Sequence, residues 1–154
     1  MIADRYEIEK YLGESLLGPT YVVKNINTNK LLALKFIRSE YKEIDELRDV
    51  QELLKRARRV QHPNVVRYGN VGKYNEMIFF TQEYFPSVNL RQLILDYEAE
   101  EKLFAIKEAC QIASKVLEAL SAIHEQGVYH TNIKPENILI RHRRAEKTGR
   151  MVRE

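Results

Sequence analysis

The hydrophobic pattern of this chain changes its period near Pro86, and that change constrains the fold more than any other feature. Before Pro86, short runs of apolar, β-branched and aromatic residues predict strands. These runs cover residues 5–12, 19–25, 31–37, 65–68 and 77–84. One helical period, over residues 44–60, interrupts them and places Leu53 on its core-facing side. It ends at His62-Pro63-Asn64, because proline disfavours helix in the residue before it.

After Pro86 the apolar residues follow a helical spacing, which predicts helices over residues 90–95 and 103–126. Gly127 supplies a stop for the second helix, and Cys110 falls within its apolar pattern, which predicts a buried thiol. A sheet followed by helices indicates an α+β fold. We expect a five-stranded antiparallel sheet with one helix in residues 1–85, and a helical domain in residues 86–154.

The composition bounds the class of protein. A length of 154 residues with 44% hydrophobic residues suffices for one packed domain or for part of a larger one. The single cysteine excludes an internal disulfide and a cysteine-based zinc site, and a reducing, cytoplasmic setting fits it best. No apolar stretch is long enough to span a membrane, and the N-terminus lacks the plan of a signal peptide, so no membrane partner is expected.

The positive charge of the chain is concentrated at its end. Residues 141–154 carry a formal charge of +4, while residues 1–140 carry −1. A basic segment can bind phosphate or nucleic acid. This segment contains no Phe, Tyr or Trp that could stack on a base, so a solvated tail is favoured and nucleic-acid binding is not expected.

Two features in the strand region point to a nucleotide phosphate. Gly13 and Gly18 bracket a turn between two predicted strands, where the absence of a Cβ lets backbone N–H groups approach phosphate oxygens. Such a turn alone is most often an ordinary hairpin. Lys35, however, ends the apolar run Leu32-Ala33-Leu34, where a lysine is costly to bury unless its charge has a partner.

The most specific motif is His130-Thr131-Asn132-Ile133-Lys134-Pro135-Glu136-Asn137. It resembles the catalytic loop of the Ser/Thr protein kinases, His-Arg-Asp-Leu-Lys-Pro-Glu-Asn, with asparagine at the position of the catalytic aspartate. The glycine turn, the strand of Lys35 and His62-Pro63-Asn64 stand in the order and spacing of that family. The resemblance covers residues 5–140 and implies a kinase-like fold with an incomplete second lobe, because the sequence ends before an Asp-Phe-Gly motif.

In the first half of the chain, the resemblance implies an ATP site. The glycine turn would cover the phosphates, Lys35 would hold the α- and β-phosphates, and Ala33 would pack on the adenine. The family pattern Gly-x-Gly-x-x-Gly-x-Val is changed at two positions, where Ser15 replaces a glycine and Thr20 replaces the valine. The nucleotide-binding residues implied here are Leu12, Gly13, Ser15, Gly18, Thr20, Ala33 and Lys35.

The resemblance also implies contacts further along the chain. Backbone groups of Glu83 and Phe85 would bond the adenine edge, and Asn89 would contact the ribose. Leu139 would also lie at the nucleotide. Kinases pair their lysine with a glutamate on the following helix, and two alternatives are open here: either Glu52 is that partner, or the pair is absent, because the family spacing falls one residue later on a leucine.

The catalytic loop argues against full activity. By resemblance, Lys134 would stabilise the γ-phosphate and Asn137 would bind magnesium, as the one family metal ligand in this sequence. Asn132 can orient a hydroxyl but cannot take its proton as a carboxylate does, and the loss of a general base lowers rates by about 10²–10⁴-fold. Thr131 replaces the arginine that reads a phosphorylated activation loop in many kinases.

Three interpretations follow. We favour a pseudokinase-like domain that binds ATP, holds magnesium weakly, and transfers phosphate to protein Ser/Thr poorly or not at all. The alternatives are a non-catalytic interaction module with a vestigial pocket, and the N-terminal part of an active Ser/Thr kinase completed by further sequence. The helix over residues 103–126 would lack its usual covering helix, so its apolar side should be partly exposed, and a protein partner or the missing C-terminal lobe is expected there.

Overall fold

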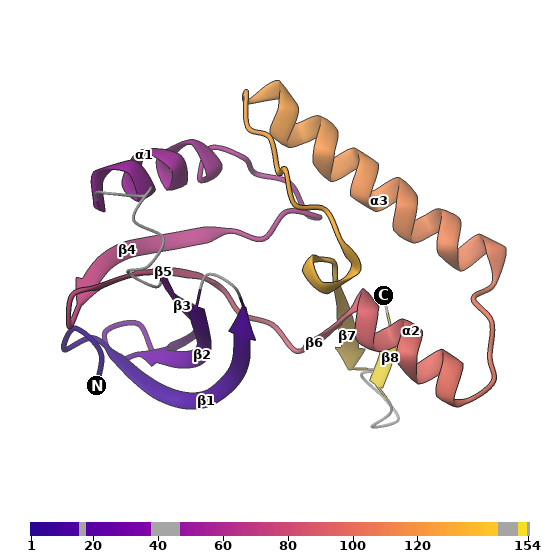
Figure 1. Ribbon diagram of the computed structural model, residues 1–154, viewed down its shortest axis with the longest axis horizontal. Helices are drawn as coiled ribbons and strands as arrows, with labels where there is room; N and C mark the ends of the chain where they lie inside the picture. Colours follow the sequence, from indigo (N-terminus) through magenta and orange to yellow (C-terminus); the bar gives the residue numbers. More distant parts are fainter. Residues whose placement is uncertain (16–17, 38–46, 145–150, 154) are drawn as a thin grey trace. The chain divides into compact units, whose positions relative to one another are not determined.

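The computed structural model describes residues 1–15, 18–37, 47–144 and 151–153. It divides into two compact units, Met1–Tyr84 and Phe85–Glu154, which are described separately. Figure 1 shows the strands and the helix of the first unit in indigo to magenta, and the two long helices of the second unit in red and orange.

The first unit is a five-stranded antiparallel sheet with one helix, which confirms the fold predicted from the sequence. The strands run in the spatial order β1-β2-β3-β5-β4, and each neighbouring pair is antiparallel. Their bounds are β1 Tyr6–Ser15, β2 Gly18–Asn25, β3 Lys30–Ile37, β4 Tyr68–Tyr74 and β5 Met77–Glu83. The helix α1 spans Leu47–Ala57, and the first three residues of the helix predicted from the sequence lie outside the described residues.

One face of this sheet carries the larger core. Successive residues of a strand point to opposite faces, so Leu34 and Phe36 of β3 share a face with Phe79 of β5. With Val23 and Tyr6 they belong to one buried cluster. The ring centroids of Phe79 lie 5.9 Å from Tyr6 and 6.1 Å from Phe36, in the edge-to-face arrangement that aromatic rings prefer. This aromatic cluster packs β1, β3 and β5 together on one face of the sheet.

The helix α1 packs on the opposite face through Leu54. This leucine is 5% exposed and lies in a cluster with Ile37, Val71 and Phe80. Leu53, which the apolar pattern places on the core side, is 61% exposed, so that prediction is wrong. Adjacent helical residues point about 100° apart, so only one of the two leucines can face the sheet, and the pattern alone does not decide which.

The strand β4 starts where the predicted strand at residues 65–68 ends, so that prediction is wrong. Its sequence contains Gly69 and Gly72, and glycine is depleted in strands. The packing explains both glycines. A Cβ at Gly72 would lie 2.7 Å from Cζ of Phe79, and a Cβ at Gly69 would meet the hydroxyl of the fully buried Thr81. Bare backbone is therefore required where β4 lies beside these side chains.

The second unit contains two helices, α2 over Leu90–Ala99 and α3 over Ile106–Glu125. The helix α2 runs past its predicted end at residue 95, and α3 begins later than predicted. Asn89 caps α2, because its side-chain oxygen accepts a hydrogen bond from the Gln92 N–H at 2.8 Å. The Tyr97 ring stacks on Phe104 with 4.4 Å between centroids, which joins the end of α2 to the segment before α3.

The helix α3 buries one side and exposes the other. Ile123 is 8% exposed, whereas Leu117 is 65% exposed and Ile106 is 84% exposed, which confirms the expected exposure of part of its apolar surface. Cys110 is exposed as well, so the prediction of a buried thiol is wrong. It lies four positions after Ile106, on the same side of the helix. Gly127 ends α3 as predicted: it has a φ of +66°, and its N–H donates to the helix.

The second unit also contains a small sheet that the sequence pattern does not predict. Its strands are β6 Ser87–Asn89, β7 Leu139–Arg144 and β8 Met151–Arg153, in that spatial order, and a 3₁₀ turn, η1 Pro135–Asn137, precedes β7. The strands β6 and β8 have three residues each, too few to show a period of two. In the part of the chain that the structure describes, no helix is both long and apolar enough to cross a membrane.

Candidate functional site

The glycine turn is a hairpin between β1 and β2. Ser15 pairs with Gly18 across it, and the Ser15 hydroxyl donates a hydrogen bond to the Gly18 carbonyl with 3.3 Å between the oxygens. Gly13 has a φ of +132°, and a Cβ there would meet no atom within 4 Å. Leu12 precedes it at a bulge and is 44% exposed. The hairpin therefore offers open backbone at Gly13, and the hydroxyl of Ser15 links the end of β1 to the start of β2.

Three of the predicted nucleotide residues share one face of the sheet. Lys35 pairs with Thr20 across β2 and β3, and Ala33 lies two positions before Lys35 on β3. Because side chains alternate along a strand, all three point to the face on which Ile37 packs against α1. Gly13 pairs with Thr20 from β1. The fold thus gathers a cation, a small side chain and open backbone on neighbouring strands.

The structure pairs Glu52 with Lys55 rather than with Lys35. The Glu52 carboxylate lies 3.5 Å from the Lys55 ammonium on the same helix, and the Glu52 side chain is 57% exposed. Of the two alternatives left open by the sequence, this geometry favours the absence of a Glu52–Lys35 pair. Residues 38–46, between β3 and α1, lie outside the described residues.

Glu83 is tied to the segment that precedes β4. Its N–H donates to the Arg67 carbonyl at 2.9 Å, and its carboxylate accepts from the Arg67 N–H at 3.0 Å. Since the N–H and the carboxylate already have these partners, a hydrogen bond from Glu83 to an adenine would have to use the Glu83 carbonyl.

In the second unit, Asn89 and Leu139 are brought together, because they pair across β6 and β7. The Asn89 oxygen already caps α2, so its amide NH₂ is the group left for a ribose hydroxyl. Leu139 is 40% exposed. The Arg141 guanidinium lies 4.2 Å from the centre of the Phe85 ring, a cation–π contact that holds Phe85 to the end of the small sheet.

The predicted catalytic loop contains a strained turn. Thr131 has a φ of +56°, a left-handed conformation that is rare for a β-branched residue. The Asn132 N–H donates to the His130 carbonyl at 2.8 Å and also lies 3.3 Å from Nδ1 of His130. A hydrogen bond across one residue closes a γ-turn, and a positive φ at the residue between belongs to the rare, strained form of this turn. Such a residue costs about 1–3 kcal/mol of backbone strain, which is common at functional sites, and Thr131 directly precedes Asn132.

Asn137 is oriented by its own loop. Its side-chain nitrogen donates to the Asn132 carbonyl at 2.9 Å, and its backbone N–H donates to the Lys134 carbonyl at 2.9 Å. The amide oxygen of Asn137 is then the end available to a cation, and oxygen is the ligand that magnesium prefers. The described residues contain no group of three or more His, Cys, Asp or Glu that could hold a metal. Asn132 and Lys134 are both exposed.

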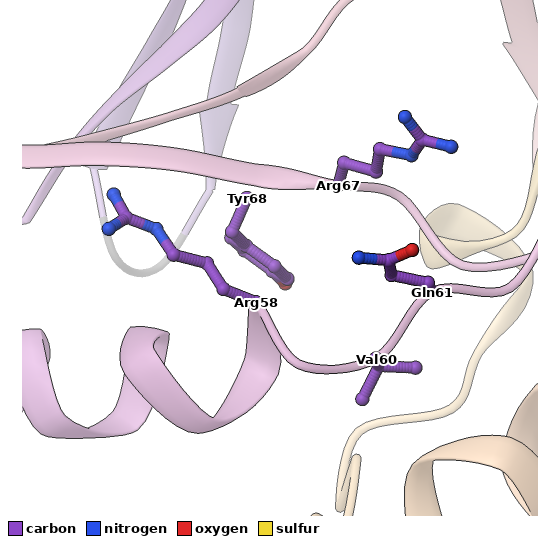
Figure 2. Close-up of a pocket in the computed structure, with 5 residues that line it drawn as sticks. All are labelled: Arg58, Val60, Gln61, Arg67 and Tyr68. Carbon is purple, nitrogen blue, oxygen red and sulfur yellow. The ribbon is translucent and has the colours of Figure 1, made fainter.

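A hollow of about 150 Å³ is lined by none of the predicted nucleotide residues. Figure 2 shows the side chains that line it, Arg58, Val60, Gln61, Arg67 and Tyr68. Burial raises the pKa of the Tyr68 hydroxyl above its ordinary value of 10.0, so this hydroxyl remains a hydrogen-bond donor at neutral pH. No motif in the sequence points to this hollow; the basic run at residues 55–59 is the signal that could have revealed it.

The sheet with its glycine hairpin, the lysine on β3 and the loop before β7 together define the class of a protein kinase domain. Residues 6–149 match the family described as protein kinase domain. The chain therefore belongs to the protein kinase domain family.

Individual relatives agree. The chain is 30% identical over 137 residues to cyclin-dependent kinase F-4 of Oryza sativa subsp. japonica, covering 89% of this chain and 29% of that protein. It is 31% identical over 136 residues to the serine/threonine-protein kinase MAK of Mus musculus, covering 88% and 21%. A double mutant of the Mycobacterium tuberculosis PknI kinase domain superposes with a TM-score of 0.81 at 23% identity, covering 92% of this chain and 57% of that one. The chain thus spans less than a third of these curated relatives.

Proposed function

We propose that this kinase-like domain binds ATP and transfers its γ-phosphate to protein Ser/Thr poorly or not at all. The observation that carries the first half of this proposal is the shared sheet face of Thr20, Ala33 and Lys35 beside the hairpin of Gly13. The second half rests on Asn132, which stands where kinases carry an aspartate.

The residues on β1 to β3 suit a nucleotide. Lys35 supplies a point charge for phosphate oxygens, and the open backbone at Gly13 permits their close approach. Ala33 has a small side chain, which leaves more room beside β3 for a flat base than a larger residue would. ATP would supply the phosphoryl group in this family. The chain's own contribution would be to hold the phosphates and to orient the adenine.

The loop of Asn132 suits orientation better than proton transfer. The amide of Asn132 can hydrogen-bond a substrate hydroxyl but has no basic oxygen to accept its proton at neutral pH. Lys134 would stabilise the γ-phosphate. Asn137 would offer one oxygen to magnesium, so the ion would be held mainly by phosphate oxygens and water. Phosphoryl transfer depends on positioned metal ions, and one neutral ligand positions them weakly.

The test is a titration of the purified chain with a fluorescent ATP analogue, with and without magnesium. Replacement of Lys35 by alanine should weaken binding by about tenfold or more, because a charge-assisted contact to phosphate is lost. Lys30→Ala is the matched control, since Lys30 is an exposed lysine at the start of the same strand. It should leave the affinity within about twofold.

The outcomes are distinct. Equal affinities for the Lys35 and Lys30 variants would remove the proposed phosphate contact. No saturable binding by the wild-type chain, with a cooperative thermal melt that ATP does not raise, would contradict ATP binding itself, because a ligand of the native state raises its stability.

A second candidate function, a non-catalytic interaction module, is favoured by one observation. Leu117 and Ile106 expose apolar surface on one side of α3. Large exposed apolar surface is typical of binding surfaces. Absence of ATP binding in the titration would leave this candidate as the preferred one. In either case we propose a cytoplasmic setting, as the composition indicates.

A further inference from the structure

The helix α3, drawn in orange in Figure 1, exposes a narrow apolar stripe along one side. Ile106 is 84% exposed and Leu117 is 65% exposed, and Cys110 and Ala113 between them are exposed as well. Since each residue turns a helix by about 100°, these four side chains fall within about 60° of one another around the axis. We call them the α3 stripe. Covering such surface removes apolar atoms from water and is favourable.

The helix uses a different side against its own unit. Ile112 and Val116 are partly buried, and Ile123 is 8% exposed. These residues lie about 80–120° around the axis from the α3 stripe. The residues that α3 buries in its own unit are therefore distinct from those of the stripe, which is left for a contact with another molecule.

The spacing of the α3 stripe suits packing against a second helix. Its residues are separated by four, three and four positions, the heptad spacing of a seam between two helices. Two copies laid antiparallel about a two-fold axis would place Ile106 of one copy opposite Leu117 of the other, and Cys110 opposite Ala113. The large side chains then meet at the two ends, and the small ones at the centre allow the helices to approach closely.

Charges along one edge of the stripe favour the antiparallel arrangement. Lys107, Glu118 and Glu125 form one row, because separations of 11 and 18 positions are close to whole turns. In an antiparallel pair this row meets the same row running in reverse, so Lys107 of each copy lies near Glu118 of the other. A parallel pair would instead set the row beside Ala109 and Val116, which carry no charge.

The arrangement of charge is thus complementary to itself. We propose that α3 is a self-association surface, on which a second copy of this chain docks antiparallel through the α3 stripe. The two-fold axis closes the contact, so the product is a dimer rather than an open chain of copies.

An anionic surface is a poorer match for α3. The helix carries two lysines and three glutamates, a formal charge of −1 with histidine neutral. Helices that lie on membranes or follow nucleic acid backbones are rich in Lys and Arg. The charge of α3 therefore favours a protein surface with both signs of charge, which a second α3 provides.

The first test is sedimentation velocity of the full chain over a range of concentrations. We expect a reversible monomer–dimer equilibrium with a Kd of about 1–100 μM, because one pair of helices buries less surface than a standard interface. Ile106→Glu with Leu117→Glu should weaken the dimer by about tenfold or more, since it places charges in an apolar contact. The matched control, Leu31→Glu with Leu53→Glu, makes the same change at two exposed leucines of the first unit and should stay within about twofold.

The second test addresses orientation. Lys107→Glu and Glu118→Lys should each weaken the dimer by about threefold or more at low salt, because each sets like charges opposite one another twice. An equimolar mixture of the two variants should restore it, since every opposed pair then joins a lysine and a glutamate. Restoration by mixing is a readout that a general loss of stability cannot produce.

Cys110 gives a third readout, because it is the one cysteine of the chain and lies near the proposed axis. A bismaleimide with a spacer of about 8 Å, similar to the distance between packed helix axes, should join two copies. The control variant, Cys110→Ser with Lys115→Cys, moves the thiol about 140° around the helix and should not be joined above the level of random collision.

Other outcomes would overturn the proposal. A monomer at every concentration would remove self-association, and equal weakening by the control leucines would place the contact elsewhere. Failure of the mixture to restore the dimer, or equal cross-linking from position 115, would contradict the antiparallel arrangement, and growth beyond a dimer would contradict two-fold closure. Circular dichroism should verify folding, and Ile106→Gln with Leu117→Gln replaces the glutamate variant if that variant unfolds. Self-association is measured without nucleotide, so its failure and a failure of ATP binding remain distinguishable.

Discussion

Truncation of Leu54 to alanine tests the register of α1 on the sheet. Leu54 is 5% exposed and packs with Ile37 and Phe80, whereas its neighbour Leu53 is 61% exposed. Buried leucine-to-alanine changes destabilise by about 2–5 kcal/mol, from lost transfer free energy and the cavity left behind. The Leu54 cluster is small and lies at one edge of the sheet, so surrounding side chains can relax, and we expect the lower part of this range, about 2–3 kcal/mol.

The adjacent leucine provides the matched control. Leu53→Ala removes mostly exposed atoms and introduces the residue with the highest helix propensity, so its effect should lie within about 0.5 kcal/mol of zero. If the first unit melts on its own, 2–3 kcal/mol corresponds to a fall in Tm of about 8–24 °C. Urea unfolding followed by far-UV circular dichroism measures both variants, and an unchanged m-value would show that stability alone has changed.

One result of comparing the two alanine variants would contradict the assigned register of α1. If Leu53→Ala destabilises as much as Leu54→Ala, or more, then Leu53 occupies the core position and the register of α1 is wrong. A conservative variant, Leu54→Met, should cost less than about 1.5 kcal/mol, because it preserves most of the buried volume. It remains measurable if the alanine variant is too unstable to purify.

Three further predictions concern the loop, the titration of a tyrosine and catalysis. Thr131→Gly should stabilise the chain by about 1 kcal/mol in urea unfolding, since glycine adopts a φ of +56° without strain; a loss of stability would contradict a strained turn. The raised pKa of Tyr68 contributes stability that is present below pH 10 and lost as pH rises through the folded-state value, so the free energy of unfolding should fall more steeply above pH 10 in wild type than in Tyr68→Phe. Parallel curves for the two proteins would refute that assignment. Asn132→Asp should not give measurable phosphorylation of a generic protein substrate by this 154-residue chain, because Asn137 is the one family metal ligand in it, and incorporation of labelled phosphate above background would show otherwise.

The sequence predicted the class of fold because its strongest signals are long or specific. The period-two runs around Val23 and Phe79 and the loop from His130 to Asn137 each carry many residues that agree. Errors arose where two adjacent residues are chemically alike, as at Leu53 and Leu54, because hydrophobicity cannot choose between them. The start of β4 was mispredicted for another reason: its glycines satisfy a packing requirement that only the folded neighbours define.

The candidate site was likewise predicted only in part from the sequence. Residue identity was sufficient to propose Lys35 and Asn137, because their motifs are specific in type and spacing. It could not reveal that Glu52 pairs with Lys55 on its own helix, because that depends on the direction in which the side chains of α1 point. Nor could it reveal that the Asn89 oxygen caps α2, because that depends on the residue at which the helix begins. The hollow beside Arg58 was invisible, because its lining comes from two elements whose side chains meet only after folding.

The cap of α2 couples two parts of the second unit that are far apart in sequence. Asn89 accepts from the Gln92 N–H with its side chain and pairs with Leu139 through its backbone, while the Leu90 N–H donates to the Ile138 carbonyl at 2.8 Å. Neither the first turn of α2 nor the end of the predicted catalytic loop can open without breaking hydrogen bonds that the two share. These amides should therefore exchange with solvent deuterium in one cooperative event, as a single unfolding unit. A ligand that engaged the loop would then protect the helix as well, although it touched none of its residues.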